Sequence, residues 1–159
     1  MRLWAKQLIP YLPKLQLLSQ WWECCAICSN WANKGTPNHL LVNKVMNYPS
    51  VHFMEYTRLV VDEMTNRGYK LNPIVGEKFV KNFDKFGNSS ETIIGANVER
   101  VIFEGWHNER YLRECLFNLE EKAMCNGIPK NEWKIIYDKF GKDFDLWKEK
   151  ISYEYYWFD

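Results

Sequence analysis

The sequence predicts an all-α protein that folds as a single compact helical domain over residues 1–159. Apolar residues recur at helical spacing in several segments, whereas strand-like segments are scarce. The length suits one domain with a core of its own. The hydrophobic fraction of 47% and the charged fraction of 26% are ordinary for a globular protein.

The first helix is expected to be long, from Leu15 to about Asn33, with Gly35 ending it. A turn bracketed by Pro10 and Pro13 precedes it, and we expect the N-terminal arm before that turn to insert against the helices. One stripe of this helix is apolar and another is mostly polar. The apolar stripe holds Leu18, Trp21, Trp22, Cys25, Cys28 and Ala32, and the polar stripe holds Gln16, Gln20, Glu23, Asn30 and Lys34.

The second helix should run roughly from Asn38 to Asn47, where Tyr48-Pro49 stops it. A third helix has the clearest helical period in the chain, with Ser50 as its N-terminal cap and Gly68 as its C-terminal cap. Residues 71–106 are less regular, because Pro73, Gly76, Gly87 and Gly95 break the helical pattern, and a loop is expected at 87–90. Further helices are expected at about 108–125, 129–140 and 142–153, followed by an aromatic tail at 153–158.

Composition restricts the environment and the class of partner. The chain has five cysteines, an odd number that fits a reducing compartment better than a disulfide framework. No apolar run has the length of a membrane span and no signal peptide begins the sequence, so we expect a soluble, cytoplasmic protein with no membrane partner. Residues 1–70 hold eight Lys and Arg against four Asp and Glu, which modestly favours an anionic partner.

The chain also contains an internal echo. His52-x-x-x-Tyr56-x-Arg58 and His107-x-x-x-Tyr111-x-Arg113 each stand near the start of a predicted helix. Two matches of three residues favour coincidence, or shared helix-start chemistry, over a duplicated site.

The N-terminus supplies the strongest candidate for chemistry. Arg2 is a large residue that blocks removal of the initiator methionine, so the mature chain is expected to begin at Met1. An α-amine has a pKa of about 7.7–8.0, well below the value of about 10.4 for lysine, and is therefore the better nucleophile at neutral pH. An amine that forms a Schiff base, beside a carboxylate such as Glu23 that moves protons, makes a complete lyase site.

These residues resemble the pyrimidine-dimer DNA glycosylase/AP lyase family, the dimer-excising endonuclease V type, and within it a bacterial branch. The resemblance rests on Met1-Arg2-Leu3, on the run from Leu17 to Glu23 in the first helix, and on Arg67-Gly68-Tyr69 at the end of the third. It covers residues 1–70. Where the phage-type enzymes have arginines beside the catalytic glutamate, this chain has Trp22 and Ala26.

The resemblance implies a DNA repair enzyme that acts on pyrimidine dimers or abasic sites in damaged double-stranded DNA. Met1 would be the nucleophile and Glu23 the proton-transfer group, with no metal or other cofactor required. The residues expected to contact DNA are Arg2, Trp21, Trp22, Lys34 and His39.

Other interpretations stay open at this point. Trp21 and Trp22 also fit core packing, and Cys24 and Cys28 suit buried thiols better than a zinc site. His39 could cap its helix or line a cleft as a proton shuttle. The alternatives to an enzyme are a helical module that binds distorted nucleic acid without cleaving it, or a protein-interaction scaffold. The oligomeric state is not indicated.

Overall fold

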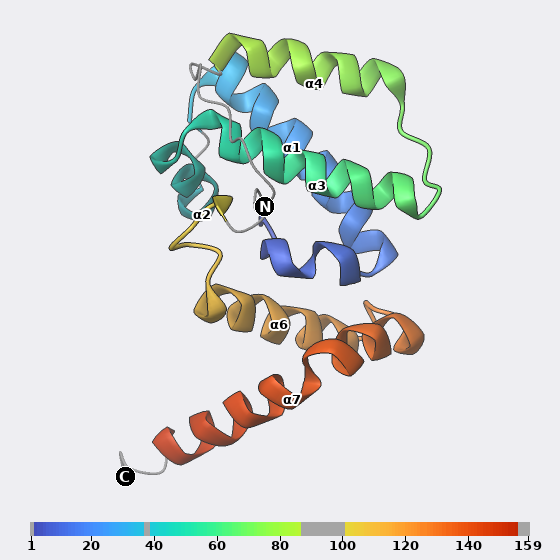
Figure 1. Ribbon diagram of the computed structural model, residues 1–159, viewed down its shortest axis with the longest axis vertical. Coiled ribbons are helices and arrows are strands. Elements are labelled where there is room, and N and C mark those ends of the chain that lie inside the picture. The colour runs from blue at the N-terminus through green and yellow to red at the C-terminus, as the bar shows by residue number, and fades with distance from the viewer. Residues whose placement is uncertain (1, 37–38, 87–100, 156–159) are drawn as a thin grey trace.

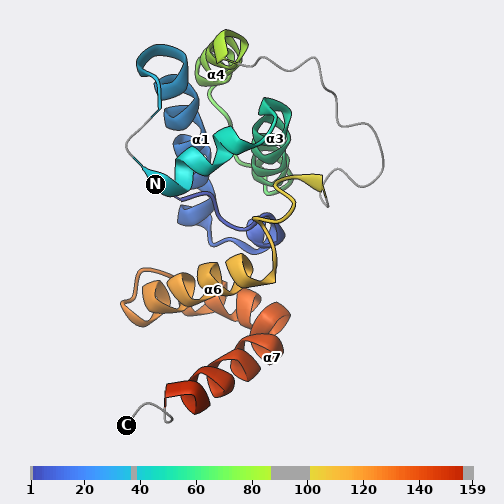
Figure 2. The same ribbon diagram turned by 90° about the vertical axis from the view of Figure 1, so that its left-hand side faces the viewer.

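Every regular element of the computed structural model is a helix within the residues that it describes, which confirms the all-α class. The structure describes residues 2–36, 39–86 and 101–155, with side chains as far as residue 149. The helices succeed one another along the long axis, from α4 (Pro73–Phe86) at one end to α7 (Lys130–Tyr155) at the other (Figure 1). Figure 2 shows the same order from the side.

The long first helix is confirmed as α1 (Lys14–Lys34), which begins directly after Pro13 and ends at Gly35. Gly35 has a φ of 77°, a left-handed conformation that glycine adopts without steric cost. Helix α1 contacts both α3 (Ser50–Asn66) and α4. It is therefore the central helix of the N-terminal half.

The turn between the arm and α1 contains a short 3₁₀ helix, η1 (Lys6–Tyr11), which packs against α3. Its end is held by the Arg67 guanidinium, which donates to the backbone carbonyls of Leu12 at 2.6 Å and Pro10 at 2.9 Å. The arginine of the Arg67-Gly68-Tyr69 segment thus fixes the path of the chain into α1.

The second predicted helix is shorter than expected. Helix α2 spans Leu40–Asn43, and a 3₁₀ helix, η2 (Lys44–Asn47), completes the segment up to Tyr48. Residues 37 and 38, where the prediction placed the helix start, lie outside the described residues.

Helix α3 begins at Ser50 itself, so the expected capping role of Ser50 is wrong: the N-cap position is Pro49, and no side chain there accepts a hydrogen bond. The C-terminal cap is confirmed. Gly68 has a φ of 75° and its N–H donates to the Thr65 carbonyl, while the Tyr69 N–H donates to the Met64 carbonyl. These two bonds form a Schellman motif.

Helix α4 lies in the segment that the sequence predicted to be less regular. Pro73 occupies the first helical position, where its missing N–H costs nothing. Asn72 precedes it, and its side-chain oxygen accepts from the Ile74 N–H at 3.0 Å. A proline and a glycine at 73 and 76 therefore start and continue a helix here.

Helix α6 (Glu109–Met124) agrees closely with the prediction, and the Asn108 side chain caps it by accepting from the Tyr111 N–H. The two last predicted helices are one continuous helix, α7, so the expected break near Gly141 is wrong. A Cβ at Gly141 would lie 3.1 Å from the Tyr137 ring, so this glycine provides space for an aromatic side chain within the helix. The predicted loop at 87–90 and the side chains of the aromatic tail lie outside the described parts of the chain.

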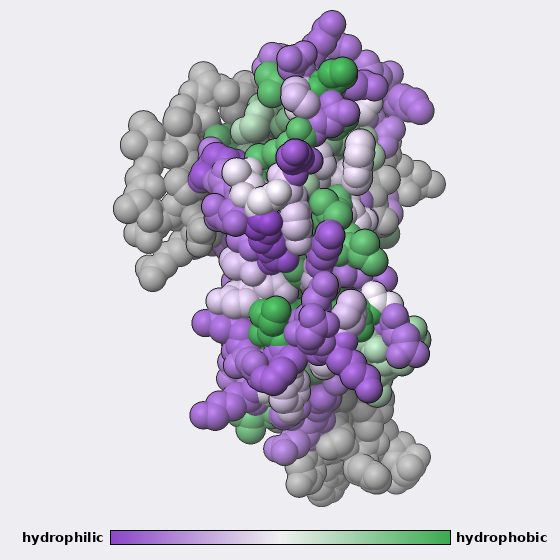
Figure 3. Space-filling model, turned by 90° about the vertical axis from the view of Figure 1, so that its right-hand side faces the viewer, coloured by the Kyte–Doolittle hydropathy of each residue, from purple (hydrophilic) through white to green (hydrophobic). Residues whose placement is uncertain are grey.

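The buried side chains form one cluster that extends from Leu3 to Trp147 and includes residues of the arm and of all the long helices. On the face shown in Figure 3, apolar patches are separated by polar side chains. No helix in the described ranges is long and apolar enough to cross a membrane.

Candidate active site

The N-terminal arm is the centre of the candidate site. Residues 2–5 form no regular element, yet Leu3, Trp4 and Ala5 are buried among the helices. Backbone groups buried in this way need hydrogen-bond partners, because an unpaired polar group in the interior is costly. In this arm the partners are side chains that come from three different helices and from the segment before α6.

The first set of partners binds alternate backbone N–H groups of the arm. The Arg2 N–H donates to Glu23 Oε2 at 2.8 Å and the Trp4 N–H donates to Gln20 Oε1 at 3.0 Å. Gln20 and Glu23 stand three residues apart on α1 and therefore share one face of that helix. The sequence placed both on a polar stripe, and these two members of the stripe bind the arm.

The third N–H in this series, that of Lys6, donates to His107 Nδ1 at 3.0 Å. His107 is 3% exposed and surrounded by aromatic rings, among them those of Tyr56, Phe103 and Trp106. Burial, and then the charges of nearby lysines, lower the pKa of His107 to about 3. The imidazole is therefore neutral at physiological pH and acts as a hydrogen-bond acceptor for the arm.

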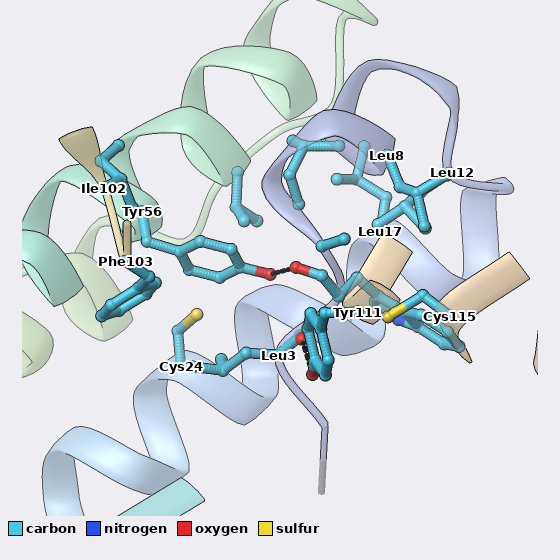
Figure 4. Close-up of a cluster of buried hydrophobic side chains, with 14 of the residues drawn as sticks. Leu3, Leu8, Leu12, Leu17, Cys24, Tyr56, Ile102, Phe103, Tyr111 and Cys115 are labelled. Atoms are coloured by element: carbon cyan, nitrogen blue, oxygen red, sulfur yellow. Dashed lines mark hydrogen bonds between the residues drawn. The ribbon is translucent and has the colours of Figure 1, made fainter. Parts of the chain in front are cut away.

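The second set of partners binds consecutive carbonyls. The Tyr111 hydroxyl donates to the Leu3 carbonyl at 2.6 Å, and the Tyr56 hydroxyl donates to the Trp4 carbonyl at 2.8 Å. Figure 4 shows the two tyrosines approaching the arm from different directions. Both are deeply buried, and burial is the largest cause that raises the pKa of each phenol well above its ordinary value.

These two tyrosines belong to the internal echo of the sequence. In each copy the histidine accepts a backbone N–H through Nδ1, from Phe103 for His52 and from Lys6 for His107, at 3.0 Å in both cases. In each copy the tyrosine four residues later donates to a carbonyl of the arm. The two copies therefore share hydrogen-bond chemistry. The sequence favoured coincidence or helix-start chemistry, and did not predict that both tyrosines bind the arm.

Glu23 is partly exposed, in contrast to the fully buried Gln20 and Cys24 beside it. One of its carboxylate oxygens binds the arm through Arg2. A carboxylate at the boundary of core and solvent, in contact with the second residue of the chain, is well placed to exchange protons with groups near the N-terminus. Met1, the predicted nucleophile, lies outside the described residues, so its role stays a prediction.

The Arg2 guanidinium packs against the ring of Trp4. Its guanidinium carbon lies 5.6 Å from the centroid of the Trp4 ring, in a cation–π arrangement. It also lies near the Cys115 thiol: burial raises the pKa of that thiol, whereas the Ala5 backbone and the Arg2 charge lower it. Arg2 is partly exposed, and its predicted contact with DNA stays a prediction.

The two adjacent tryptophans of α1 differ sharply. Trp21 is 5% exposed and packs against Phe79 at a centroid distance of 5.6 Å, so it belongs to the core and offers no stacking surface to a base. Trp22, next to Glu23 in the sequence, is 58% exposed. Of this pair, only Trp22 has a ring that a nucleic-acid base could reach.

The structure places Lys34 far along α1 from Glu23, and His39 at the start of another helix. Lys34 is exposed at the last turn of α1, eleven residues beyond Glu23, which corresponds to about 16 Å along the helix. His39 occupies the N-cap position of α2, and its Nδ1 accepts from the Val42 N–H at 3.4 Å. A DNA strand would have to extend well beyond Glu23 to reach Lys34, and the contacts of Lys34 and His39 with DNA stay predictions.

The cysteines of α1 behave as core residues. Burial raises the pKa of Cys24 and of Cys28 to about 12 and that of Cys25 to about 11, so none is a thiolate near neutral pH. They are therefore poor nucleophiles. No three metal-ligating side chains come together in the part of the chain that the structure describes.

Comparison with known proteins gives a family match over just under half of the chain. Residues 1–75 match the family described as pyrimidine dimer DNA glycosylase, which confirms over this segment the resemblance found in the sequence. No curated protein and no solved structure matches the chain. The matched segment contains the arm, Glu23, Gln20 and Tyr56, whereas His107 and Tyr111 lie beyond it.

Proposed function

We propose that the protein is a DNA repair glycosylase/AP lyase that acts on pyrimidine dimers or abasic sites in double-stranded DNA, with the α-amine of Met1 as nucleophile and Glu23 as proton-transfer group. The observation that carries the proposal is the 2.8 Å hydrogen bond from the Arg2 N–H to the Glu23 carboxylate. The family of residues 1–75 is described as a DNA glycosylase, and this family supplies the class of substrate.

Covalent geometry supports the pairing of these groups. In a chain that begins at Met1, the α-amine is joined to the Arg2 nitrogen through two carbon atoms, and standard bond lengths keep the two nitrogens within about 4 Å of each other. The Arg2 nitrogen lies 2.8 Å from Glu23 Oε2. The amine and the carboxylate are therefore within about 7 Å in any conformation of Met1, and a water molecule or a sugar hydroxyl can bridge that gap.

The chemistry needs only proton transfers and movements of electron pairs. The amine lone pair attacks C1′ of the damaged nucleotide, and the base leaves with the electrons of the glycosidic bond and gains a proton. Opening of the sugar ring and loss of a proton from nitrogen give an imine that is protonated in its reactive form. Removal of a 2′ proton then expels the 3′ phosphate by β-elimination, and water hydrolyses the imine to restore the amine.

Glu23 suits the acid–base part of this sequence. Its carboxylate accepts the proton that the attacking nitrogen loses, stabilises the cationic imine, and takes the 2′ proton during elimination. At an abasic site the same amine condenses with the C1′ aldehyde and releases water. The exposed ring of Trp22 lies on the same helix and provides a surface on which an unstacked base can stack.

The proposal is tested by borohydride trapping on a duplex that carries one abasic site, after intact-mass measurement has shown that the chain begins at Met1. We expect a covalent adduct whose modified peptide contains Met1, and no adduct after the α-amine has been acetylated. Glu23→Gln keeps an oxygen for the Arg2 N–H but removes the base, so we expect strand cleavage to fall about 100-fold or more with DNA binding retained.

Glu132→Gln is the matched control. Glu132 also accepts a backbone N–H, that of Lys14 at 2.8 Å, but it stands at the start of α7 away from the arm, so this variant should cleave like the wild type. An adduct on a lysine would contradict the role of Met1. Intact abasic and dimer-containing DNA without any adduct would contradict the enzyme, and would favour the non-catalytic binding module or the interaction scaffold.

A further inference from the structure

Two tyrosine hydroxyls bind the arm close to its free end. Tyr111 donates to the Leu3 carbonyl and Tyr56 to the Trp4 carbonyl, at 2.6 and 2.8 Å. Tyr56 comes from α3, within the family-matched segment, and Tyr111 comes from α6, outside it. The arm is therefore held between the two halves of the chain.

The two hydroxyls form a clamp, because they come from different helices and bind consecutive carbonyls of the arm. The N–H groups of Arg2 and Trp4 are bound in turn by Glu23 and Gln20. The arm can then neither slide along its own axis nor rotate about it without breaking several buried hydrogen bonds.

The tyrosines have no other assignment in the proposed chemistry. Both are buried, and burial raises the pKa of each phenol, so the hydroxyls stay protonated and act as donors throughout the neutral pH range. Each hydroxyl is bonded to a backbone carbonyl rather than directed to a substrate group. A role in chemistry can therefore act only through the position of the arm.

We propose that Tyr56 and Tyr111 are positioning residues for the α-amine: they fix how far the arm inserts, and so fix the distance between the nucleophile and Glu23. This inference rests on the proposed function, because it assigns the two tyrosines to the same reaction. It also means that α6 completes the site. Tyr111, which binds the carbonyl nearer to the N-terminus, belongs to α6 and lies outside residues 1–75.

The test compares Tyr111→Phe and Tyr56→Phe with the wild type in single-turnover borohydride trapping on abasic duplex DNA. Each substitution removes one hydroxyl and keeps the ring. We expect the rate constant of adduct formation to fall about tenfold or more, because small misplacements of a reacting group are costly, while DNA affinity and the final amplitude stay unchanged. The two variants are independent tests, since the tyrosines lie on different helices.

Tyr48→Phe is the matched control. Its hydroxyl also donates to a backbone carbonyl, that of Glu104 at 3.0 Å, and this carbonyl lies outside the arm. This variant should keep the wild-type rate constant. In a Glu23→Gln background, Tyr111→Phe should slow trapping less than it does alone, because both changes act on the same pairing of amine and carboxylate.

A second readout does not depend on activity. Hydrogen exchange at the Trp4 and Lys6 amides should become faster in Tyr111→Phe and in Tyr56→Phe, and should stay unchanged in Tyr48→Phe. Rate constants of both Phe variants within twofold of the wild type would overturn the inference. A lower final amount of adduct with an unchanged rate constant would also overturn it, because a smaller folded fraction produces that result. A wild type that forms no adduct would overturn the proposed function as well, and is recognised without any variant.

Discussion

Acidification should destabilise this protein through the imidazole of His107. The ring is buried, its Nδ1 accepts the Lys6 N–H, and its Nε2 has no hydrogen-bond partner within the described parts of the chain. Burial, followed by the charges of Lys6 and Lys44, lowers the pKa from 6.5 to about 3. Protonation would place a charge in an aromatic environment and would turn Nδ1 into a donor that repels the Lys6 N–H.

The size of the effect follows from this pKa difference. Below pH 6.5 the unfolded chain takes up a proton at His107 and the folded protein does not, so the unfolded state is favoured as the pH falls. The loss in the free energy of unfolding is about 1.4 kcal/mol per pH unit, or about 2 kcal/mol at pH 5, and it continues toward pH 3. Above pH 6.5 this contribution disappears, because the histidine is then neutral in both states.

Urea unfolding at several pH values between 7.5 and 5.0 measures this dependence. His107→Gln removes the titrating ring, so its free energy of unfolding, although lower at pH 7.5, should fall by about 2 kcal/mol less than that of the wild type between pH 6.5 and 5.0. Equal slopes for the two proteins would refute the reasoning. So would NMR titration of the His107 ring with a midpoint near 6.5 in the folded protein.

Four further substitutions test the structure directly. Trp21→Ala should lower the free energy of unfolding by about 3–5 kcal/mol in urea titrations, whereas Trp22→Ala should change it by less than about 0.5 kcal/mol. Trp22→Ala should instead weaken binding of abasic DNA by about 1–3 kcal/mol. Equal losses of stability in the two variants would contradict the assignment of Trp21 to the core and Trp22 to the surface. Gly68→Ala should cost about 1 kcal/mol through its positive φ alone, since the space around it is open, and an unchanged melting temperature would disprove this. Gln20→Ala should cost about 1–3 kcal/mol by leaving the buried Trp4 N–H unpaired, measured by chemical unfolding; a neutral effect would mean that water replaces the amide.

The helices that the sequence predicted well are those whose signals are local. The apolar period of α1 and α3, the glycines that follow them and the Asn108 cap of α6 act within a few residues, so reading the chain in order finds them. Helix α4 was missed because Pro73 and Gly76 were interpreted as breaks. The Asn72-Pro73 pair is in fact a start signal, with a capping side chain followed by a proline in the first turn.

The candidate site was only partly predictable for the opposite reason. Glu23 was found through the family resemblance, but Gln20 was assigned to a polar stripe because nothing in the helix itself shows that Gln20 is buried. Its partner is the Trp4 backbone N–H, a group that every residue except proline carries and that leaves no mark in the sequence. Tyr111 and His107 were equally hidden, since their contacts join positions about a hundred residues apart.

That separation has a consequence for the order of events during synthesis. The arm, α1 and α3 are made early, so the bonds of the arm to Gln20, Glu23 and Tyr56 can form before α6 exists. The groups that bind Leu3, Lys6 and Gln7 belong to residues 107 and 111, which are made much later. Closing so long a loop is entropically costly until its contacts form together, so docking of the arm is completed late. In a nascent chain Glu23 is already present, but the clamp that fixes the arm is complete only when α6 has folded.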